Sequence, residues 1–252
     1  MRRHSPSLII AASLLALVVA SPCSAQDHHD HQPDHGSKHG HGHQHGDLHA
    51  PGHHHDFSDV ERWVAIFDAP DRDEWQQPAQ VVELMGLAPG MHVADLGAGT
   101  GYFLPHLAAA VGTGGHVYGL DIEESLVAHM NDRAEEAGLD HVEARVVPTD
   151  APGLPDGSLD RLLIVNTWHH LDDRPNYARK IGRVLKDGGQ LMIVDFTLES
   201  EQGPPKKHRL SPERVIAELE AGGLSARVLE ETLPRQYVVV ATAGDSQPHA
   251  RD

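Results

Sequence analysis

The chain has few basic residues, few aromatic residues and a single cysteine. Its 252 residues include 20 Lys and Arg against 37 Asp and Glu, which gives a formal net charge of −17. Binding to nucleic acid or to anionic lipid headgroups needs a basic surface, so this balance argues against both kinds of partner. We therefore expect the protein to bind a small-molecule substrate and not nucleic acid. The sequence does not predict an oligomeric state.

Aromatic side chains make up only 4% of the sequence, yet Val, Leu, Ile and Ala recur in well-spaced runs. A hydrophobic core can therefore form without many aromatic rings. The length allows one sizeable α/β domain with appendages and is too short for two full domains. Composition and pattern predict four parts of the chain: an N-terminal segment at 1–25, a histidine-rich tract at 26–56, a folded domain at 57–243 and a C-terminal tail at 244–252.

Residues 1–25 have the features of a secretory signal peptide. Arg2 and Arg3 give a positive start, residues 8–20 are apolar, and small side chains including Cys23 precede the expected cleavage point. The apolar run is shorter than the ~20 residues that a membrane-spanning helix needs. We expect export to the periplasm, with no stable membrane insertion after cleavage and no thiol in the mature chain. A buried N-terminal helix and lipidation at Cys23 are the alternatives.

Residues 26–56 form a tract rich in His, Asp, Gly and Gln with almost no apolar side chains, which predicts disorder. Neutral imidazole is a good ligand for zinc, copper and nickel, so the tract predicts several weak, exchangeable metal sites. The alternative is a solvated spacer that gains positive charge below about pH 6.5. The predicted metal ligands are His39, His41, His43, His45, His53, His54 and His55.

The remaining chain predicts strands that alternate with helices, which is typical of a parallel sheet covered on both faces. Before this alternation, residues 60–67 predict a short helix, residues 71–75 a loop, and Pro78 the start of a second helix. The expected strands are 91–96, 115–120, 141–147, 159–166 and 189–197, and the expected helices are 101–111, 123–137 and 174–186.

The last part of the domain predicts a different connection. A helix is expected to start at Ser211-Pro212-Glu213, and strands are expected at about 224–230 and 236–242. The link between these two strands is too short for a crossover, so it predicts an antiparallel hairpin. Residues 244–252 are polar and are expected to fray.

A glycine-rich motif follows the first of the alternating strands and precedes a helix. It contains Asp95, Gly97, Gly99, Gly101 and Tyr102. Glycines there let the backbone turn sharply and approach a ligand that a Cβ atom would obstruct. Tyr102 stands where a dinucleotide-binding motif would have its third glycine, which favours an adenosyl amino acid over NAD. No lysine follows to make a phosphate-binding loop.

Two further acids follow the next two strands. Asp121 ends the second strand, where a carboxylate can accept hydrogen bonds from both hydroxyls of a ribose. Asp150 follows the third strand, where a carboxylate can accept a hydrogen bond from an adenine amino group. Polar side chains at the carboxyl ends of adjacent parallel strands predict a ligand crevice.

With these motifs, residues 78–242 resemble class I S-adenosylmethionine-dependent methyltransferases, near the ubiquinone/menaquinone-biosynthesis type. Segments 154–160 and 185–191 are also similar to that family. The resemblance implies a three-layer, Rossmann-like α/β fold with a seven-stranded, mostly parallel sheet and an antiparallel last strand. It implies S-adenosylmethionine as cofactor, with the glycine motif on its methionine part, Asp121 on the ribose and Asp150 on the adenine. Tyr102, Ile122 and Asn166 complete the predicted cofactor set.

The expected acceptor side has fewer signals. His169 and His170 follow the fourth strand and Asp195 lies near the end of the fifth, so these are the predicted catalytic residues. Either histidine can deprotonate or orient an acceptor, or pack against a helix or cap a loop. Asp195 can orient substrate or bind a loop backbone. Trp75 and Arg72 are predicted to close the other side of the pocket as a lid. The alternative is that Trp75 only packs against neighbouring side chains.

The basic residues of the loop at 203–210 can bind an acidic substrate, or the loop is simply exposed to solvent. The leading hypothesis is therefore a methyltransferase that acts on a small molecule. The second hypothesis is an exported metal-binding protein that uses a methyltransferase-like domain as a scaffold or as a sensor of adenosyl ligands. The export signal favours the second hypothesis, whereas intact acids at 95, 121 and 150 favour the first.

Overall fold

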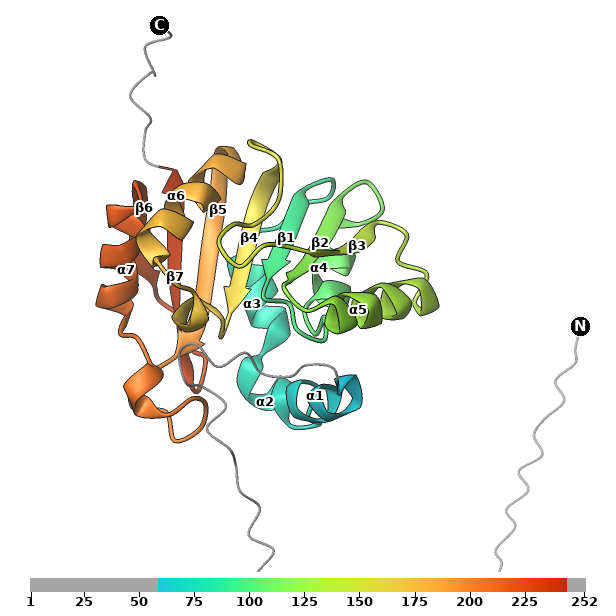
Figure 1. Cartoon of the computed structure of the whole chain (residues 1–252), viewed down its shortest axis with the longest axis horizontal. Helices are drawn as coiled ribbons and strands as arrows, with labels where there is room; N and C mark the ends of the chain where they lie inside the picture. The colour runs from blue at the N-terminus through green and yellow to red at the C-terminus, as the bar shows by residue number, and fades with distance from the viewer. Residues whose placement is uncertain (1–58, 244–252) are drawn as a thin grey trace, which may run out of the picture. The chain divides into compact units, whose positions relative to one another are not determined.

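The computed structural model describes residues 59–243, which form a seven-stranded sheet with helices on both faces (Figure 1). The predicted signal peptide, the histidine tract and the C-terminal tail lie outside these residues. Within residues 59–243, none of the helices has the length and apolar character that crossing a membrane requires.

The strand order is β3-β2-β1-β4-β5-β7-β6, and β7 runs antiparallel to both of its neighbours while the other pairs are parallel. This order places β1 and β4 side by side in the middle of the sheet, where the direction of strand addition reverses. Such a reversal opens a crevice at the carboxyl ends of parallel strands. The predicted fold is confirmed. The strands are β1 His92–Leu96, β2 His116–Asp121, β3 Val142–Val146, β4 Leu159–Val165, β5 Leu185–Phe196, β6 Leu224–Leu229 and β7 Gln236–Ala243.

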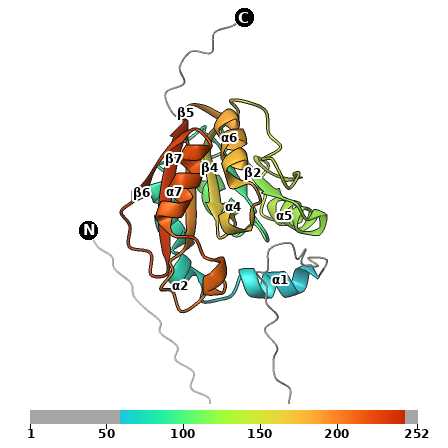
Figure 2. The same ribbon diagram turned by 60° about the vertical axis from the view of Figure 1, so that its left-hand side comes forward.

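Side chains alternate across the sheet and divide the core into two layers. In β1, Val93 packs with one hydrophobic cluster, whereas Ala94 and Leu96 pack with the other. The helices α3, α4 and α5 contribute to the first cluster, and α6 and α7 contribute to the second. Helices α6 and α7 lie side by side (Figure 2). Their bounds are α3 Pro78–Leu84, α4 Leu104–Val111, α5 Glu124–Glu136, α6 Arg174–Val184 and α7 Pro212–Ala221.

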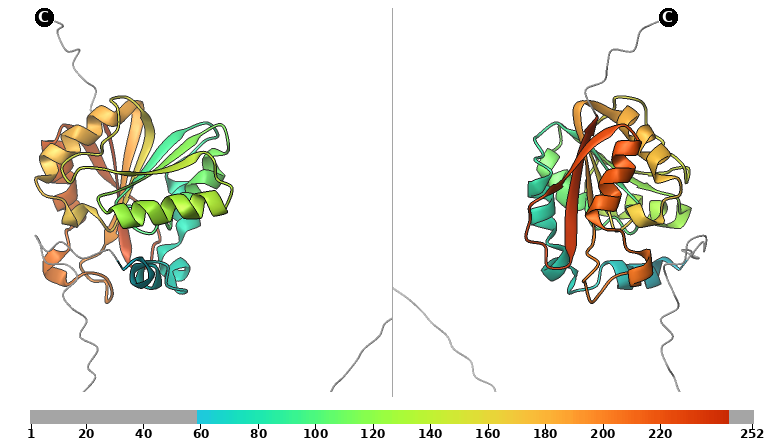
Figure 3. Two further views of the ribbon diagram at one scale, coloured as in Figure 1. Left: turned by 45° about the vertical axis from the view of Figure 1, so that its right-hand side comes forward. Right: turned by 90° about the vertical axis from the view of Figure 1, so that its left-hand side faces the viewer.

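Two short helices, α1 Val60–Phe67 and α2 Arg72–Gln76, lie by the edge of the sheet where the parallel strands end (Figure 3). The Asp59 side chain caps α1 by accepting a hydrogen bond from the Arg62 backbone N–H at 3.1 Å. The sequence predicted a loop for the second of these segments, and that prediction was wrong. Five residues are too few to show a helical period, so the pattern gave no signal.

Two predicted boundaries also differ. Helix α4 begins at Leu104, not at residue 101, because Gly101 has φ +80° and a turn precedes the helix. Strand β5 begins at Leu185, inside the helix that was expected to reach residue 186. The backbone of Leu185 is already extended, and this residue pairs with Leu159 ahead of an irregularity in the β4–β5 ladder. The predicted antiparallel pairing of the last two strands is confirmed.

Two 3-10 turns complete the fold: η1 Trp168–His170 follows β4, and η2 Lys206–His208 lies in the segment between β5 and α7. Helix α7 begins as predicted, because Ser211 accepts a hydrogen bond from the Arg214 N–H at 3.3 Å and Pro212 occupies the first turn.

Candidate active site

The loop after β1 is closely packed against its surroundings. Gly97, Gly99 and Gly101 have φ values of +73°, +58° and +80°, a backbone region that favours glycine. A Cβ atom on Gly97 would lie 2.4 Å from the Thr167 side chain, and one on Gly99 would lie 3.3 Å from the Phe67 ring. Side chains of the protein thus occupy the space next to these glycines, and a substitution at Gly97 would push the loop away from β4.

Asp95, at the end of β1, is a buried acid of which only 3% is exposed. Burial raises the pKa of its carboxyl to about 7, Arg72 opposes this shift and Asp121 adds to it. Among residues 59–243 no group donates a hydrogen bond to this carboxylate. A cationic ligand group is the partner that such an acid lacks.

Asp121, at the end of β2, holds the glycine loop through its carboxylate. Its Oδ2 atom accepts a hydrogen bond from the Gly99 N–H at 2.9 Å, and its Oδ1 atom accepts one from the Glu123 N–H at 3.2 Å. Burial raises the pKa of Asp121, although these backbone N–H groups lower it. The next residue, Ile122, is 42% exposed. The structure therefore brings three predicted cofactor residues together: an acid, a glycine and an exposed apolar side chain.

Asp150 has different surroundings. Its side chain is 73% exposed and accepts a hydrogen bond from Lys180 Nζ of α6 at 2.6 Å. This hydrogen bond and the lysine charge lower the pKa of the Asp150 carboxyl. The role of Asp150 beside an adenine ring stays a prediction, since its carboxylate is bound to Lys180.

Helices α1 and α2 are tied to the glycine loop by polar contacts. The Arg72 guanidinium lies 3.8 Å from the centre of the Tyr102 ring and donates a hydrogen bond to the Phe67 carbonyl. Tyr102 in turn donates its hydroxyl hydrogen to Asp73. Burial lowers the pKa of Arg72, and the charge of Asp95 opposes this effect. Arg72 and Tyr102 therefore contact each other beside the glycine loop, and a lid that contains Arg72 stays a prediction.

A second link joins the end of α1 to the same loop. Asp68 accepts a hydrogen bond from Thr100 Oγ1 at 2.6 Å and forms an ion pair with Arg133 Nη1 of α5 at 2.8 Å. Arg133 also donates to the Thr100 carbonyl at 2.7 Å. Asp68 and Arg133 belong to no motif and lie 65 positions apart in the sequence, so no local pattern predicted their contact.

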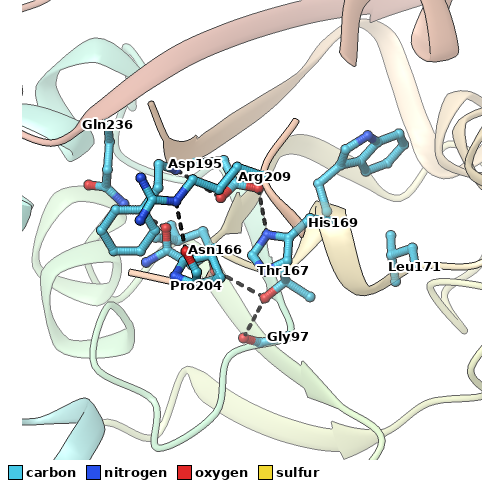
Figure 4. A network of polar contacts seen from close by, with 12 residues as sticks. Gly97, Asn166, Thr167, His169, Leu171, Asp195, Pro204, Arg209 and Gln236 are labelled. Atoms are coloured by element: carbon cyan, nitrogen blue, oxygen red, sulfur yellow. Dashed lines mark hydrogen bonds and ion pairs between the residues drawn. The ribbon is translucent and has the colours of Figure 1, made fainter. Parts of the chain in front are cut away.

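The predicted catalytic residues form a buried pair with an exposed neighbour. His169 Nδ1 donates to Asp195 Oδ2 at 2.8 Å, and these side chains are only 2% and 3% exposed (Figure 4). Asp195 Oδ1 also accepts the Phe196 N–H at 2.8 Å. His170 is exposed, and its ring centre lies 4.2 Å from that of His169. Of the two histidines, His170 is therefore the one that solvent reaches.

Next to this pair, three amide side chains form a chain of hydrogen bonds. Gln76 Nε2 donates to Gln236 Oε1 at 2.7 Å, and Gln236 Nε2 donates to Asn166 Oδ1 at 2.7 Å. Asn166 has φ +53° and directly precedes Thr167, whose hydroxyl lies 3.4 Å from the Gly97 carbonyl oxygen (Figure 4). The sequence predicted only Asn166. The two glutamines belong to no motif, and their pairing depends on how α2 and β7 meet.

The segment between β5 and η2 is held by one arginine. The Arg209 guanidinium donates to the carbonyls of Pro204 at 2.7 Å, Thr197 at 3.1 Å and Gln202 at 3.0 Å, among others (Figure 4). The basic residues of this loop predicted either a contact to an acidic substrate or simple solvation. For Arg209 the prediction of a substrate contact is wrong, because its donors already bind the backbone of its own loop.

An aromatic pair lies between this loop and α2. The ring centres of Trp75 and Phe196 are 5.7 Å apart, and the Arg235 guanidinium lies 5.3 Å from the Trp75 ring centre. A Cβ atom on Gly203 would lie 2.6 Å from the Phe196 ring, so the loop backbone packs directly on this ring. Trp75 therefore links α2 to the end of β5. This contact is compatible with both predictions for Trp75, packing and a lid.

The part of the chain that the structure describes contains no group of three or more His, Cys, Asp or Glu side chains that could hold a metal ion. The predicted zinc, copper or nickel ligands, from His39 to His55, lie outside that part.

Comparison with known proteins adds to this geometry. Residues 87–230 match a family model described as a methyltransferase domain. A ubiquinone/menaquinone biosynthesis C-methyltransferase of Hydrogenovibrio crunogenus is 35% identical over 124 residues, which is 49% of this chain and 48% of that protein. A nocamycin O-methyltransferase of Saccharothrix syringae is 30% identical over 179 residues, which is 69% of this chain and 61% of that protein.

Among solved structures, a SAM-dependent methyltransferase from Aquifex aeolicus superposes with a TM-score of 0.69 at 30% identity. The match covers 76% of this chain and 100% of that chain. In contrast, the chain spans about half the length of the curated C-methyltransferase relatives that it matches.

Proposed function

Because the chain belongs to the methyltransferase domain family, we propose that it transfers a methyl group from S-adenosylmethionine to a small-molecule acceptor. The observation that carries this proposal is the pair of buried acids, Asp95 and Asp121, that flank the glycine loop. Asp95 has no hydrogen-bond donor among residues 59–243, and Asp121 already orients the loop. Asp95 lies near the end of β1, which adjoins β4 where the sheet order reverses, and Asp121 ends the neighbouring strand β2.

The residues present fit this cofactor. Asp95 supplies a negative charge for the α-ammonium group of the methionine part, and Arg72 supplies a positive charge for its carboxylate. Asp121 has the position that a ribose needs. Ile122 presents an exposed apolar side chain next to Asp121, which suits one face of an adenine ring. Asp150 is bound to Lys180, so we assign the adenine contact to Ile122 first.

The bound cofactor supplies an electrophilic methyl group on a positively charged sulfur. The protein's part is to position the acceptor in line and to keep water out, which accounts for much of the rate of a direct displacement. The lid residues Arg72 and Tyr102 cover the glycine loop, and Phe67 lies against Gly99. These contacts exclude water from the cofactor side of the crevice.

On the acceptor side we assign proton transfer to His170 Nε2 or Nδ1, for acceptors whose reactive atom still holds a proton. His170 is exposed at the end of η1 and lies against the ring of His169. The hydrogen bond of His169 to Asp195 fixes this turn to the end of β5. His169 and Asp195 are therefore positioning residues in this proposal.

Calorimetric titration of the full chain with S-adenosylmethionine tests the proposal. We expect binding in the wild type and a loss of about 1.5–3 kcal/mol in affinity in Asp121→Ala, the contribution of a charge-assisted hydrogen bond. NAD should not compete. A folded Asp121→Ala protein with unchanged affinity would remove the ribose assignment, and absence of binding by the wild type would remove the proposed function.

We also propose that the chain is exported to the periplasm and that its histidine tract binds zinc, copper or nickel. The support is the sequence alone: the apolar run at 8–20 behind two arginines, and the closely spaced histidines of residues 26–56. This second activity is compatible with methyl transfer, since the tract and the glycine motif do not overlap. N-terminal sequencing of the protein recovered from the periplasm tests export, with Gln26 as the expected first residue.

A further inference from the structure

The chain of amides from Gln76 through Gln236 to Asn166 joins three elements that are distant in sequence. Gln76 ends α2, Gln236 begins β7, and Asn166 follows β4. The side chains of the two glutamines are inaccessible, with 0% and 1% of the residue exposed. Each hydrogen bond in this chain restricts the orientation of the next amide, although the buried Gln76 Oε1 atom itself has no hydrogen-bond partner among the described residues.

The chain of hydrogen bonds has a direction. Gln76 donates to Gln236, and Gln236 donates to Asn166, each at 2.7 Å. The Asn166 carbonyl oxygen is therefore occupied, and its amide nitrogen is the last donor of the chain. Among residues 59–243 no group accepts a hydrogen bond from that nitrogen, and it is not among the buried side-chain atoms that lack a partner. Asn166 thus has a donor without a partner among the described residues, directly after the carboxyl end of β4.

The position of this donor is set by the backbone. Asn166 has φ +53°, a conformation that asparagine adopts more readily than most side chains. Its N–H donates to the Val194 carbonyl at 2.8 Å, and the next residue, Thr167, contacts Gly97. On its other side, Gln236 is the register partner of Phe196, whose ring contacts Trp75. Asn166 therefore lies between the glycine loop and the aromatic pair.

We propose that the Asn166 amide nitrogen donates a hydrogen bond to an oxygen atom of the methyl acceptor, and that Gln236 orients the Asn166 amide for this by donating to its oxygen. The preferred acceptors carry a carbonyl or deprotonated hydroxyl oxygen beside or at the reactive atom. An ammonium group has only hydrogen-bond donors. It cannot accept a hydrogen bond from the Asn166 amide nitrogen, so this contact is unfavourable. This inference rests on the proposed methyl transfer and assigns Asn166 to the acceptor, whereas the sequence analysis placed it with the cofactor residues.

The direction of the amide chain is tested first, by two isosteric substitutions in the full chain. Asn166→Asp keeps an oxygen that accepts from Gln236, so its unfolding midpoint should stay within about 2 °C of the wild type. Gln236→Glu replaces the donor to Asn166 by an oxygen and should lower the midpoint by about 5 °C or more. The opposite order of the two effects would overturn the proposal, because Asn166 would then present its oxygen.

The acceptor preference is tested on 15N-labelled full-length protein saturated with S-adenosylhomocysteine. The side-chain amide signal of Asn166 is identified by its loss in Asn166→Asp. We expect 4-nitrophenolate to shift this signal and benzylammonium, a cation of similar size, to leave it in place. Asn166→Asp should weaken 4-nitrophenolate binding at least about tenfold, since a carboxylate repels the anion, and should leave S-adenosylhomocysteine affinity within about twofold.

Three outcomes overturn the inference: no shift with 4-nitrophenolate, an equal shift with both probes, or a loss of S-adenosylhomocysteine affinity in Asn166→Asp. The last outcome would return Asn166 to the cofactor site. A wild-type protein that does not bind S-adenosylhomocysteine is a separate result, which contradicts the proposed function itself.

Discussion

The two sides of the crevice are built in different ways. On the cofactor side, Asp95, the glycine loop and Asp121 come from one continuous stretch, and backbone N–H groups make the important contacts. On the acceptor side the contacts are between side chains from separate parts of the chain. Gln76, Gln236 and Asn166 form one chain of hydrogen bonds, and His169 binds Asp195.

This difference has a physical consequence. A backbone-built site depends on local conformation, so one substitution that changes φ should damage it severely. A site built from side-chain hydrogen bonds depends on tertiary packing, so single substitutions should change its selectivity or rate while the fold persists.

Gly97→Ala should damage the cofactor side most. The residue has φ +73°, and a Cβ atom would lie 2.4 Å from Thr167, so we expect the free energy of unfolding to fall by about 3 kcal/mol. Gly138→Ala is the matched control, because Gly138 follows the end of α5 with φ +65° and has no atom within 4 Å of the added Cβ. The control should lose only about 1 kcal/mol. Chemical denaturation measures both losses. Equal losses of unfolding free energy in the two variants would show that backbone strain alone matters and that the contact of the added Cβ atom with Thr167 does not.

On the acceptor side, His170→Ala should lower turnover by about 100-fold while S-adenosylmethionine affinity stays within about twofold. The acceptor for this assay is chosen by screening phenols, enols and amines for S-adenosylhomocysteine formation. His169→Ala is the contrasting variant: it removes the partner of a buried carboxylate and should lower the free energy of unfolding by about 3 kcal/mol. If His170→Ala loses stability instead of turnover, His170 is a packing residue.

The raised pKa of Asp95 makes cofactor binding depend on pH. Below about pH 7 the free protein holds a proton on Asp95, which must leave before the carboxylate pairs with an ammonium group. Affinity for S-adenosylmethionine should therefore fall by up to about tenfold per pH unit below about 7 and be nearly constant above it. Calorimetry at several pH values measures this dependence, and Asp95→Asn should bind weakly at every pH.

The same group affects the stability of the free protein with a defined sign. Its pKa in the folded state lies above the ordinary value of 3.8, so its contribution to stability is complete below 3.8 and is lost as pH rises to about 7. The loss amounts to at most roughly 4 kcal/mol. Asp95→Asn should lack this component, and an identical pH profile for the two proteins would contradict the burial of an ionisable Asp95.

The smallest expected effect concerns the histidine tract. Deleting residues 27–56 should change the free energy of unfolding by less than about 0.5 kcal/mol in metal-free buffer, as for sites that share no contacts. The same deletion should remove most zinc, copper or nickel binding near neutral pH. Metal binding by the intact chain should weaken as pH falls through about 6.5, because protons compete for imidazole nitrogen. Full metal stoichiometry after the deletion would place the ligands within the domain.

The sequence by itself determined the order of strands and helices, the antiparallel hairpin and the two acids beside the glycine loop. These features depend on local periodicity, on glycine conformation and on the rule that parallel strands end at one edge, all of which act over short stretches of chain. The short helix α2, with five residues, and the start of β5 at Leu185 were missed because strand pairing and packing override weak local signals.

Only the tertiary structure decided how the acceptor side is arranged. It separated His169 from His170, burying one against Asp195 and exposing the other, although the two are adjacent and identical in type. It bound Asp150 to Lys180, directed Arg209 to its own loop and joined Gln76 to Gln236 across 160 positions of sequence. Hydrogen bonds between side chains depend on which elements pack together in space, and no local pattern in a sequence records that arrangement.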